Sequence, residues 1–174
     1  MITVVSGTNR PESRSIQVAT YYLNLLQARN IEAQLIDLSH LPQDFIFTAL
    51  YGKPHQHPEF FSFVEKINQS EKFVFIVPEY NISIPGILKA FIDGLDYKKS
   101  FQGKKCALVG ISSGTIGGAI ALSHLTDILN YLGMHVLAIK PRLPKIETLM
   151  VDGEIKDKFL TELVNTQVAA LLSF

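Results

Sequence analysis

Residues that could bind an anion gather in the segment Ser6–Ser15, near the start of the chain. Gly7 allows a tight turn there, and Pro11 holds Arg10 in an extended conformation before a helix begins. A helix start exposes free N–H groups, and guanidinium groups match phosphate geometry well. The segment has neither a Gly-Lys-Ser/Thr ending nor a Gly-x-Gly-x-x-Gly pattern, so it predicts a cradle for one terminal phosphate, as in a mononucleotide. An ordinary capped helix start is the alternative. The candidate ligands are the side chains of Thr8, Arg10, Ser13 and Ser15, with Ser13 as the N-cap.

A second segment, Pro78–Pro85, offers a surface for a flat ring. It follows the apolar run Phe73–Val77 and stops where Pro85 and Gly86 open an amphipathic helix. Open α/β sheets bind ligands at the C-terminal ends of their strands, where this segment is expected to lie. An acid, a tyrosine, an amide and backbone donors suit a planar heteroaromatic ring. The alternative is a turn with a solvated acid and a packed tyrosine. The residues concerned are Pro78, Glu79, Tyr80, Asn81 and Ile82.

The third segment, Ser112–Gly118, is rich in glycine. Gly114, Gly117 and Gly118 let the backbone come close to a ligand or to a neighbouring strand. With Ser112 and Ser113, Gly114 could therefore form a second wall of the same site. A strand-to-helix turn made of small residues is the alternative.

Five short apolar runs alternate with segments of helical period along the chain, which predicts parallel strands covered on both faces by helices. Right-handed crossovers leave few topologies, and the flavodoxin-like order is the leading one. We therefore expect an α/β three-layer sandwich with a five-stranded parallel sheet in the order 2-1-3-4-5. The predicted strands are Ile2–Val5, Ala33–Leu38, Phe73–Val77, Ala107–Ile111 and His135–Ile139, and the predicted helices are Ser15–Arg29, one opening at Pro85-Gly86, Gly118–Leu132 and one from about Lys156.

That strand order brings the three segments together, because strands one, three and four lie side by side in it. The first segment then supplies a phosphate site, and the other two supply a slot for a ring. The natural occupant of such a site is a mononucleotide that carries a flat ring.

Composition restricts the remaining possibilities. The 174 residues are 47% apolar and 18% charged, which predicts one globular domain over residues 1–174. Sixteen basic and sixteen acidic residues give zero formal net charge, so the sequence indicates neither a nucleic-acid partner nor binding to an anionic membrane. The one cysteine, Cys106, lies in an apolar run and is expected to be a buried thiol. No secretory signal or membrane span is recognised, so we expect a soluble cytoplasmic protein.

Two further features have open interpretations. The aromatic-rich region Leu41–Phe63 predicts a loop and short helix packed on the core, with a subunit interface or a cover over the ligand as the alternative. The pair His55 and His57 has the spacing of metal ligands, but no third ligand stands nearby, so no metal site is predicted. His124 and His135 are expected to be core or surface histidines rather than catalytic ones.

The three segments resemble the NADPH-dependent FMN reductase family of flavodoxin-like proteins, which includes quinone, azo-dye and chromate reductases. That family reads approximately Gly-Ser-x-Arg-x-x-Ser-x-Asn, then Pro-Glu-Tyr-Asn-x-Ser-x-Pro-Gly-x-Leu-Lys-x-x-Ile-Asp, then Ser-x-Gly-x-x-Gly-Gly. This chain has Gly7-Thr-Asn-Arg10 with Ser13-Arg-Ser15, the whole Pro78–Asp93 pattern, and Ser112–Gly118. It departs from the pattern at Ser15, which replaces the usual Asn, at Ile82, where Gly or a polar residue is frequent, and at Gly94, which replaces a common Trp.

The resemblance implies FMN as a bound cofactor and NADPH or NADH as co-substrate, with hydride passing through the flavin to a quinone, azo compound, flavin or metal oxyanion. It also implies a homo-oligomer, either a dimer or a tetramer, with the flavin near the interface. No catalytic residue is predicted, since hydride transfer needs no general acid or base; Ile82 is expected to affect access to one ring face. A flavodoxin-type electron-transfer module and a flavin-free interaction protein are the alternatives. By resemblance, Thr8, Arg10, Ser13 and Ser15 hold the phosphate with Arg14 beside them, Pro78, Glu79, Tyr80, Asn81 and Ile82 lie against the ring, and Ser112, Ser113 and Gly114 flank it.

Overall fold

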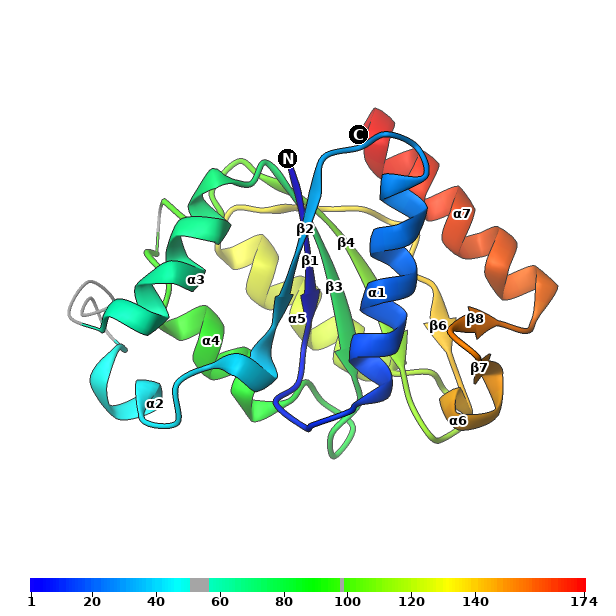
Figure 1. Ribbon diagram of the computed structural model, residues 1–174, viewed down its shortest axis with the longest axis horizontal. Helices are drawn as coiled ribbons and strands as arrows, with labels where there is room; N and C mark the ends of the chain where they lie inside the picture. The colour runs from blue at the N-terminus through cyan, green and yellow to red at the C-terminus, as the bar shows by residue number, and fades with distance from the viewer. Residues whose placement is uncertain (51–56, 98) are drawn as a thin grey trace.

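A parallel sheet between two layers of helices forms the centre of the molecule (Figure 1). The structure is a computed structural model, and it describes residues 1–50, 57–97 and 99–174. The sheet runs in the order β2-β1-β3-β4-β5, with β6 also paired to β4, which confirms the predicted flavodoxin-like order. Its strands are β1 (Ile2–Ser6), β2 (Ala33–Asp37), β3 (Lys72–Pro78), β4 (Lys105–Ile111), β5 (His135–Val136) and β6 (Arg142–Leu143); a separate hairpin joins β7 (Met150–Val151) to β8 (Glu154–Ile155).

Alternation along the central strands divides the core into two halves. In β3, Phe73 and Phe75 face one cluster of buried side chains, whereas Val74 and Ile76 face the other. The first cluster is completed by α3 (Pro58–Gln69), α4 (Gly86–Asp93) and α5 (Ala119–Tyr131), and the second by α1 (Arg14–Gln27) and α7 (Lys158–Ser173). Both faces of β3 and β4 are therefore buried, as their continuous apolar sequences predict.

The fifth position in the sheet differs from the prediction. A strand His135–Ile139 was expected, but β5 ends at Val136, and pairing with β4 resumes only at β6. Between them the Gln167 side chain, which α7 brings onto the sheet, donates to the carbonyl oxygens of Leu108 (2.9 Å) and Ile139 (2.8 Å). A buried amide thus takes the place of regular backbone pairing, and a prediction from local sequence had no means of locating it.

The aromatic-rich region packs on the core in part. Phe45, at the start of the short α2 (Phe45–Thr48), and Phe60 of α3 are buried and stacked, with ring centroids 5.2 Å apart. A Cβ on Gly94 would lie 2.6 Å from the Phe60 ring, so Phe60 fills the space beside this glycine. By contrast Phe47 is 90% exposed. Core packing is confirmed for Phe45 and Phe60, while Tyr51 lies outside the described residues.

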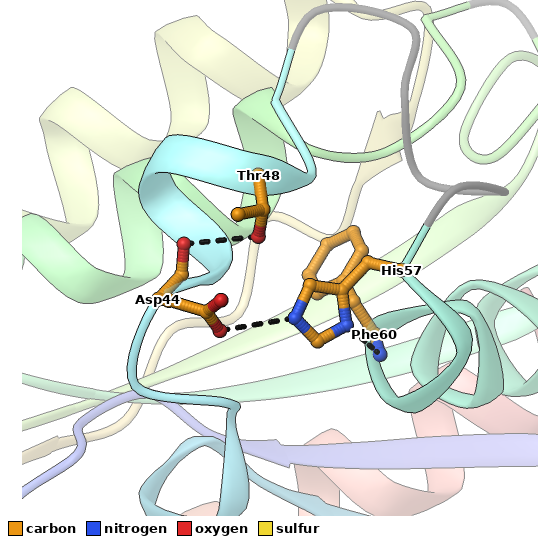
Figure 2. A network of polar contacts seen from close by, with 4 residues as sticks. All are labelled: Asp44, Thr48, His57 and Phe60. Atoms are coloured by element: carbon orange, nitrogen blue, oxygen red, sulfur yellow. Dashed lines mark hydrogen bonds and ion pairs between the residues drawn. The ribbon is translucent and has the colours of Figure 1, made fainter.

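His57 caps the start of α3, as Figure 2 shows. Its Nδ1 accepts a hydrogen bond from the Phe60 N–H (3.4 Å), so in the neutral ring Nε2 carries the proton and donates to Asp44 Oδ1 (3.0 Å). This bond holds the Asp44 pKa below its usual value. His55, the other histidine of the pair, lies outside the described residues. Across the described ranges no three His, Cys, Asp or Glu side chains gather as a metal site.

In the described part of the chain, no helix is both long enough and apolar enough to cross a membrane. Cys106 is fully buried, and burial raises the pKa of its thiol to about 12. It is therefore a core residue, as its apolar surroundings predict.

Candidate functional site

A cavity of about 470 Å³ opens at the C-terminal ends of β1, β3 and β4. In Figure 1 the arrowheads of these strands point to the lower edge of the view, where the loops after β1 and β3 lie. The cavity is of the size that small-molecule sites usually have. It is lined by Thr8, Arg10, Pro11, Glu12, Ser13, Arg14 and Ser15 from the first segment, by Pro78, Glu79 and Tyr80 from the second, and by Ile111, Ser112, Ser113, Ile146 and Glu147.

The start of α1 forms the polar end of this cavity. Ser13 is the N-cap, and its Oγ accepts from the Ile16 N–H (3.2 Å). The N–H groups of Arg14 and Ser15 precede the first intrahelical bonds and belong to the positive end of the helix dipole. The Ser15 hydroxyl is buried and has no hydrogen-bond partner among the described residues. Such an unsatisfied group costs about 1–3 kcal/mol, so an acceptor in this corner would be stabilising.

Thr8 joins the first segment to the second. Its Oγ1 shares a 2.7 Å hydrogen bond with the Tyr80 hydroxyl and accepts from the Arg10 N–H at 3.3 Å. Thr8 is fully buried, whereas Tyr80 is 37% exposed. The hydrogen bond between the Thr8 and Tyr80 hydroxyl groups therefore links the two loops and fixes the position of the tyrosine ring.

The second segment turns as a tight hairpin beyond Tyr80. The Tyr80 N–H donates to the Ser83 carbonyl (2.9 Å) and the Ser83 N–H donates back (3.0 Å). Both central residues, Asn81 and Ile82, have left-handed φ angles, of 50° and 63°. Asn tolerates this conformation, but for the β-branched Ile82 it is strained. The hairpin persists because Tyr80 is bonded to Thr8, and Ser83 shares a 2.9 Å hydrogen bond with Nδ1 of the exposed His124 on α5.

Three of the predicted site residues do not line this cavity. Asn81 and Ile82 stand at the tip of the hairpin, where both are exposed, and Ile82 has 56% of its surface accessible. Gly114 is likewise exposed outside the lining. Any contact that these three residues make with a ligand therefore involves a ligand that extends beyond this cavity.

Glycine brings the third segment close to its neighbours. A Cβ on Gly110 would lie 2.3 Å from the Gly117 carbonyl oxygen, and one on Gly117 would lie 2.8 Å from Arg142 Cβ. The Ser112 hydroxyl is used inside the turn, where it accepts from the Gly117 N–H (3.1 Å) and donates to the Gly114 carbonyl (3.2 Å). The Ser112 hydroxyl therefore stabilises the conformation of this segment, while Ser113 is exposed and lines the cavity.

The sequence reasoning missed several lining residues, of which Glu147 matters most. It lies on α6 (Ile146–Leu149), and one of its carboxylate oxygens accepts from the Ser113 hydroxyl at 2.7 Å. The bond from Ser113 lowers the pKa of Glu147 below its usual value. The backbone N–H of Glu147 and the charges of Arg14 and Arg10 lower this pKa further. The strand order could have indicated Glu147, because the residues that follow the last strand of the sheet lie at the edge where ligands bind.

Comparison with known proteins agrees with this architecture. The NADPH-dependent FMN reductase family matches residues 1–141. The chain is 32% identical over 148 residues to a 2-hydroxy-1,4-benzoquinone reductase of a Burkholderia species, covering 82% of this chain and 76% of that one. It is also 32% identical over 172 residues to an NAD(P)H-dependent FMN reductase of Pseudomonas aeruginosa, covering 96% and 90% respectively.

Solved structures show the same fold. The flavoenzyme NAD(P)H:(acceptor) oxidoreductase FerB of Paracoccus denitrificans superposes with a TM-score of 0.79 at 24% identity, over 99% of this chain and 94% of that one. The fold and the sequence matches together confirm the predicted resemblance, and at the level of the family they confirm an oxidoreductase that uses FMN and NAD(P)H. The chain belongs to the NADPH-dependent FMN reductase family.

Proposed function

We propose that this protein binds FMN in the cavity at the ends of β1, β3 and β4 and uses NAD(P)H to reduce a small acceptor. The acceptor classes are quinones, azo compounds, free flavins and metal oxyanions, and the curated relatives include a benzoquinone reductase. When bound, FMN supplies the ring that accepts and passes on hydride, and the protein supplies position and electrostatics. A cytoplasmic setting, where NAD(P)H is available, is part of the same proposal.

The polar end of the cavity suits the FMN phosphate. The observation that carries the proposal is the buried Ser15 hydroxyl at the start of α1, which has no hydrogen-bond partner within the described ranges. The side chain of Arg10 also lines the cavity and makes no hydrogen bond with any described residue. A phosphate placed here satisfies the serine and neutralises guanidinium charge. The proposed ligands are Thr8, Arg10, Ser13, Arg14 and Ser15.

The remaining walls suit a flat ring. Pro78, Glu79 and Tyr80 form one wall, and Ser112 and Ser113 form the other. Oε2 of Glu79 is buried and has no hydrogen-bond partner in the part of the chain that the structure describes. It can therefore accept from an N–H or hydroxyl group of the ligand. The Tyr80 ring is held in place by Thr8, so its role is to position the ligand.

Anaerobic stopped-flow mixing tests this function. Protein loaded with FMN is mixed with NADPH and, separately, with NADH, and the flavin absorbance is followed. We expect rapid bleaching with at least one nucleotide and recovery of the band when a benzoquinone is added. Binding of FMN without bleaching by either nucleotide would contradict the proposal and favour an electron-transfer module. Protein that stays colourless after incubation with FMN would favour a flavin-free interaction protein.

We also propose that two copies associate, as the family resemblance implies. A second cavity, of about 630 Å³, lies between α4 and α5 and is lined mainly by apolar surface. Tyr97 and Tyr131 at this groove are 56% and 77% exposed, and their rings lie 6.2 Å apart. This surface supports a subunit contact with a second copy. Light scattering is expected to give a dimer or tetramer that Tyr131→Glu dissociates; a monomeric wild type would overturn the proposal.

A further inference from the structure

The FMN cavity has an electrostatic feature that the phosphate cradle does not require. Of the side chains that line it, Arg10 and Arg14 are basic, whereas Glu12, Glu79 and Glu147 are acidic. The lining thus carries one more acidic than basic side chain, although its proposed ligand carries a phosphate of about −1.5 to −2 charge. Acidic side chains in the same cavity oppose the binding of that phosphate.

Glu147 lines the same cavity as Arg10 and Arg14. Arg14 and Arg10 both act on its carboxyl group, yet neither forms a salt bridge with it among the described residues. The carboxylate therefore lies within electrostatic range of both guanidinium groups without pairing with either. Arg14 donates to Gln17 Oε1 (2.8 Å), and the Arg10 side chain makes no hydrogen bond with any described residue. The Ser113 hydroxyl donates to the Glu147 carboxylate at 2.7 Å.

The backbone around Glu147 holds the carboxylate in that place. The Lys145 N–H donates to the Gly114 carbonyl (2.9 Å), and the Ile146 N–H donates to the Ser112 carbonyl (3.1 Å). The two residues before Glu147 are thus bonded to the glycine-rich segment Ser112–Gly118. These bonds fix the backbone of α6 beside the cavity, and the Ser113 hydroxyl holds the exposed Glu147 carboxylate on the cavity side.

We propose that Glu147 sets how tightly the site retains the phosphate of its flavin. Its charge repels the phosphate and competes for Arg10 and Arg14, so that FMN binds less tightly than the arginines and the α1 start alone would allow. Because riboflavin lacks the phosphate, its affinity does not depend on this charge. Glu147 is thus a residue that determines specificity between phosphorylated and unphosphorylated flavin. This inference rests on the proposed function.

The test compares the affinities of FMN and riboflavin, measured by fluorescence titration, in the wild type and in Glu147→Gln. The amide keeps an oxygen for Ser113 and removes the charge. We expect FMN to bind more tightly by on the order of three- to tenfold at low salt, with riboflavin unchanged within about twofold. The gain in FMN affinity should shrink as salt screens the repulsion. Glu162→Gln, which removes an exposed charge on α7, serves as the matched control and should alter neither affinity.

A second variant separates charge from positioning. Ser113→Ala removes the hydroxyl but keeps the carboxylate, so it should not reproduce the tighter FMN binding. Unchanged or weaker FMN binding in Glu147→Gln, or equal tightening for riboflavin, would overturn the role of Glu147 and leave the proposed function standing. A wild type that does not bind FMN at all would overturn both.

Discussion

Replacing Ile82 by glycine should stabilise the protein, although it removes an apolar side chain. Ile82 has a φ angle of 63°, in the left-handed region that β-branched residues avoid, and 56% of its surface is exposed. The hairpin is anchored through Tyr80 and Ser83, so the residue at the tip has to accept the conformation. Glycine adopts it without a steric penalty.

The size of the effect follows from three opposing contributions. Releasing the backbone strain is worth roughly 1–3 kcal/mol. Glycine loses more backbone freedom on folding, which costs about 0.5–1 kcal/mol. The buried part of the side chain is less than half, so its loss costs roughly 0.7 kcal/mol. The middle of each range gives a net stabilisation of about 0.5 kcal/mol, which corresponds to about 1–2 °C in Tm for a chain of this size.

Urea unfolding of apoprotein, with thermal unfolding as a second measure, gives this difference directly. Two neighbouring variants serve as controls. Asn81→Gly should be neutral or slightly destabilising, because asparagine already tolerates its φ of 50°. Ile82→Ala keeps a Cβ in the strained region and should gain nothing. The reasoning fails if Ile82→Gly is destabilising, or if Ile82→Ala stabilises as much as glycine does.

Three other perturbations test different parts of the structure. Arg10→Ala should weaken FMN binding by roughly 10- to 100-fold, the range for a charged hydrogen bond, and riboflavin by less than about threefold; equal losses in a fluorescence titration would remove its phosphate role. Gly110→Ala should destabilise by about 1–3 kcal/mol in urea, because its Cβ would lie 2.3 Å from the Gly117 carbonyl oxygen, whereas Gly86→Ala, with nothing within 4 Å, should be tolerated. Burial raises the Cys106 pKa to about 12, so its contribution to stability is full below the unfolded value of about 8.5 and is lost as pH rises toward 12. Cys106→Ala should flatten the fall in stability over that window, and native Cys106 should resist thiol reagents; rapid labelling would show that it is accessible.

Sequence patterns alone were enough to predict the sheet order and the convergence of the three loops. Runs such as Phe73–Val77 are short and apolar on both faces, as in parallel strands covered by helices, and right-handed crossovers then leave one leading topology. The start of α1 could also be predicted, because an N-cap such as Ser13 is recognised from the residues next to it in the sequence.

What the sequence did not reveal depends on contacts between distant residues. The break after β5 arises from Gln167, which reaches the sheet from α7. The left-handed turn at Ile82 opposes local preference and is imposed by Thr8 and His124 from outside the segment. Glu147 enters the site only because backbone bonds attach its segment to the glycine-rich loop.

A crystal structure of the protein grown with FMN tests the location of the site most directly. We predict the phosphate at the start of α1, within hydrogen-bond distance of Ser15 and Arg10, and the ring between the Pro78–Tyr80 wall and the Ser112–Ser113 wall. FMN seated in the groove between α4 and α5, or bound with its phosphate directed away from α1, would contradict the assignment.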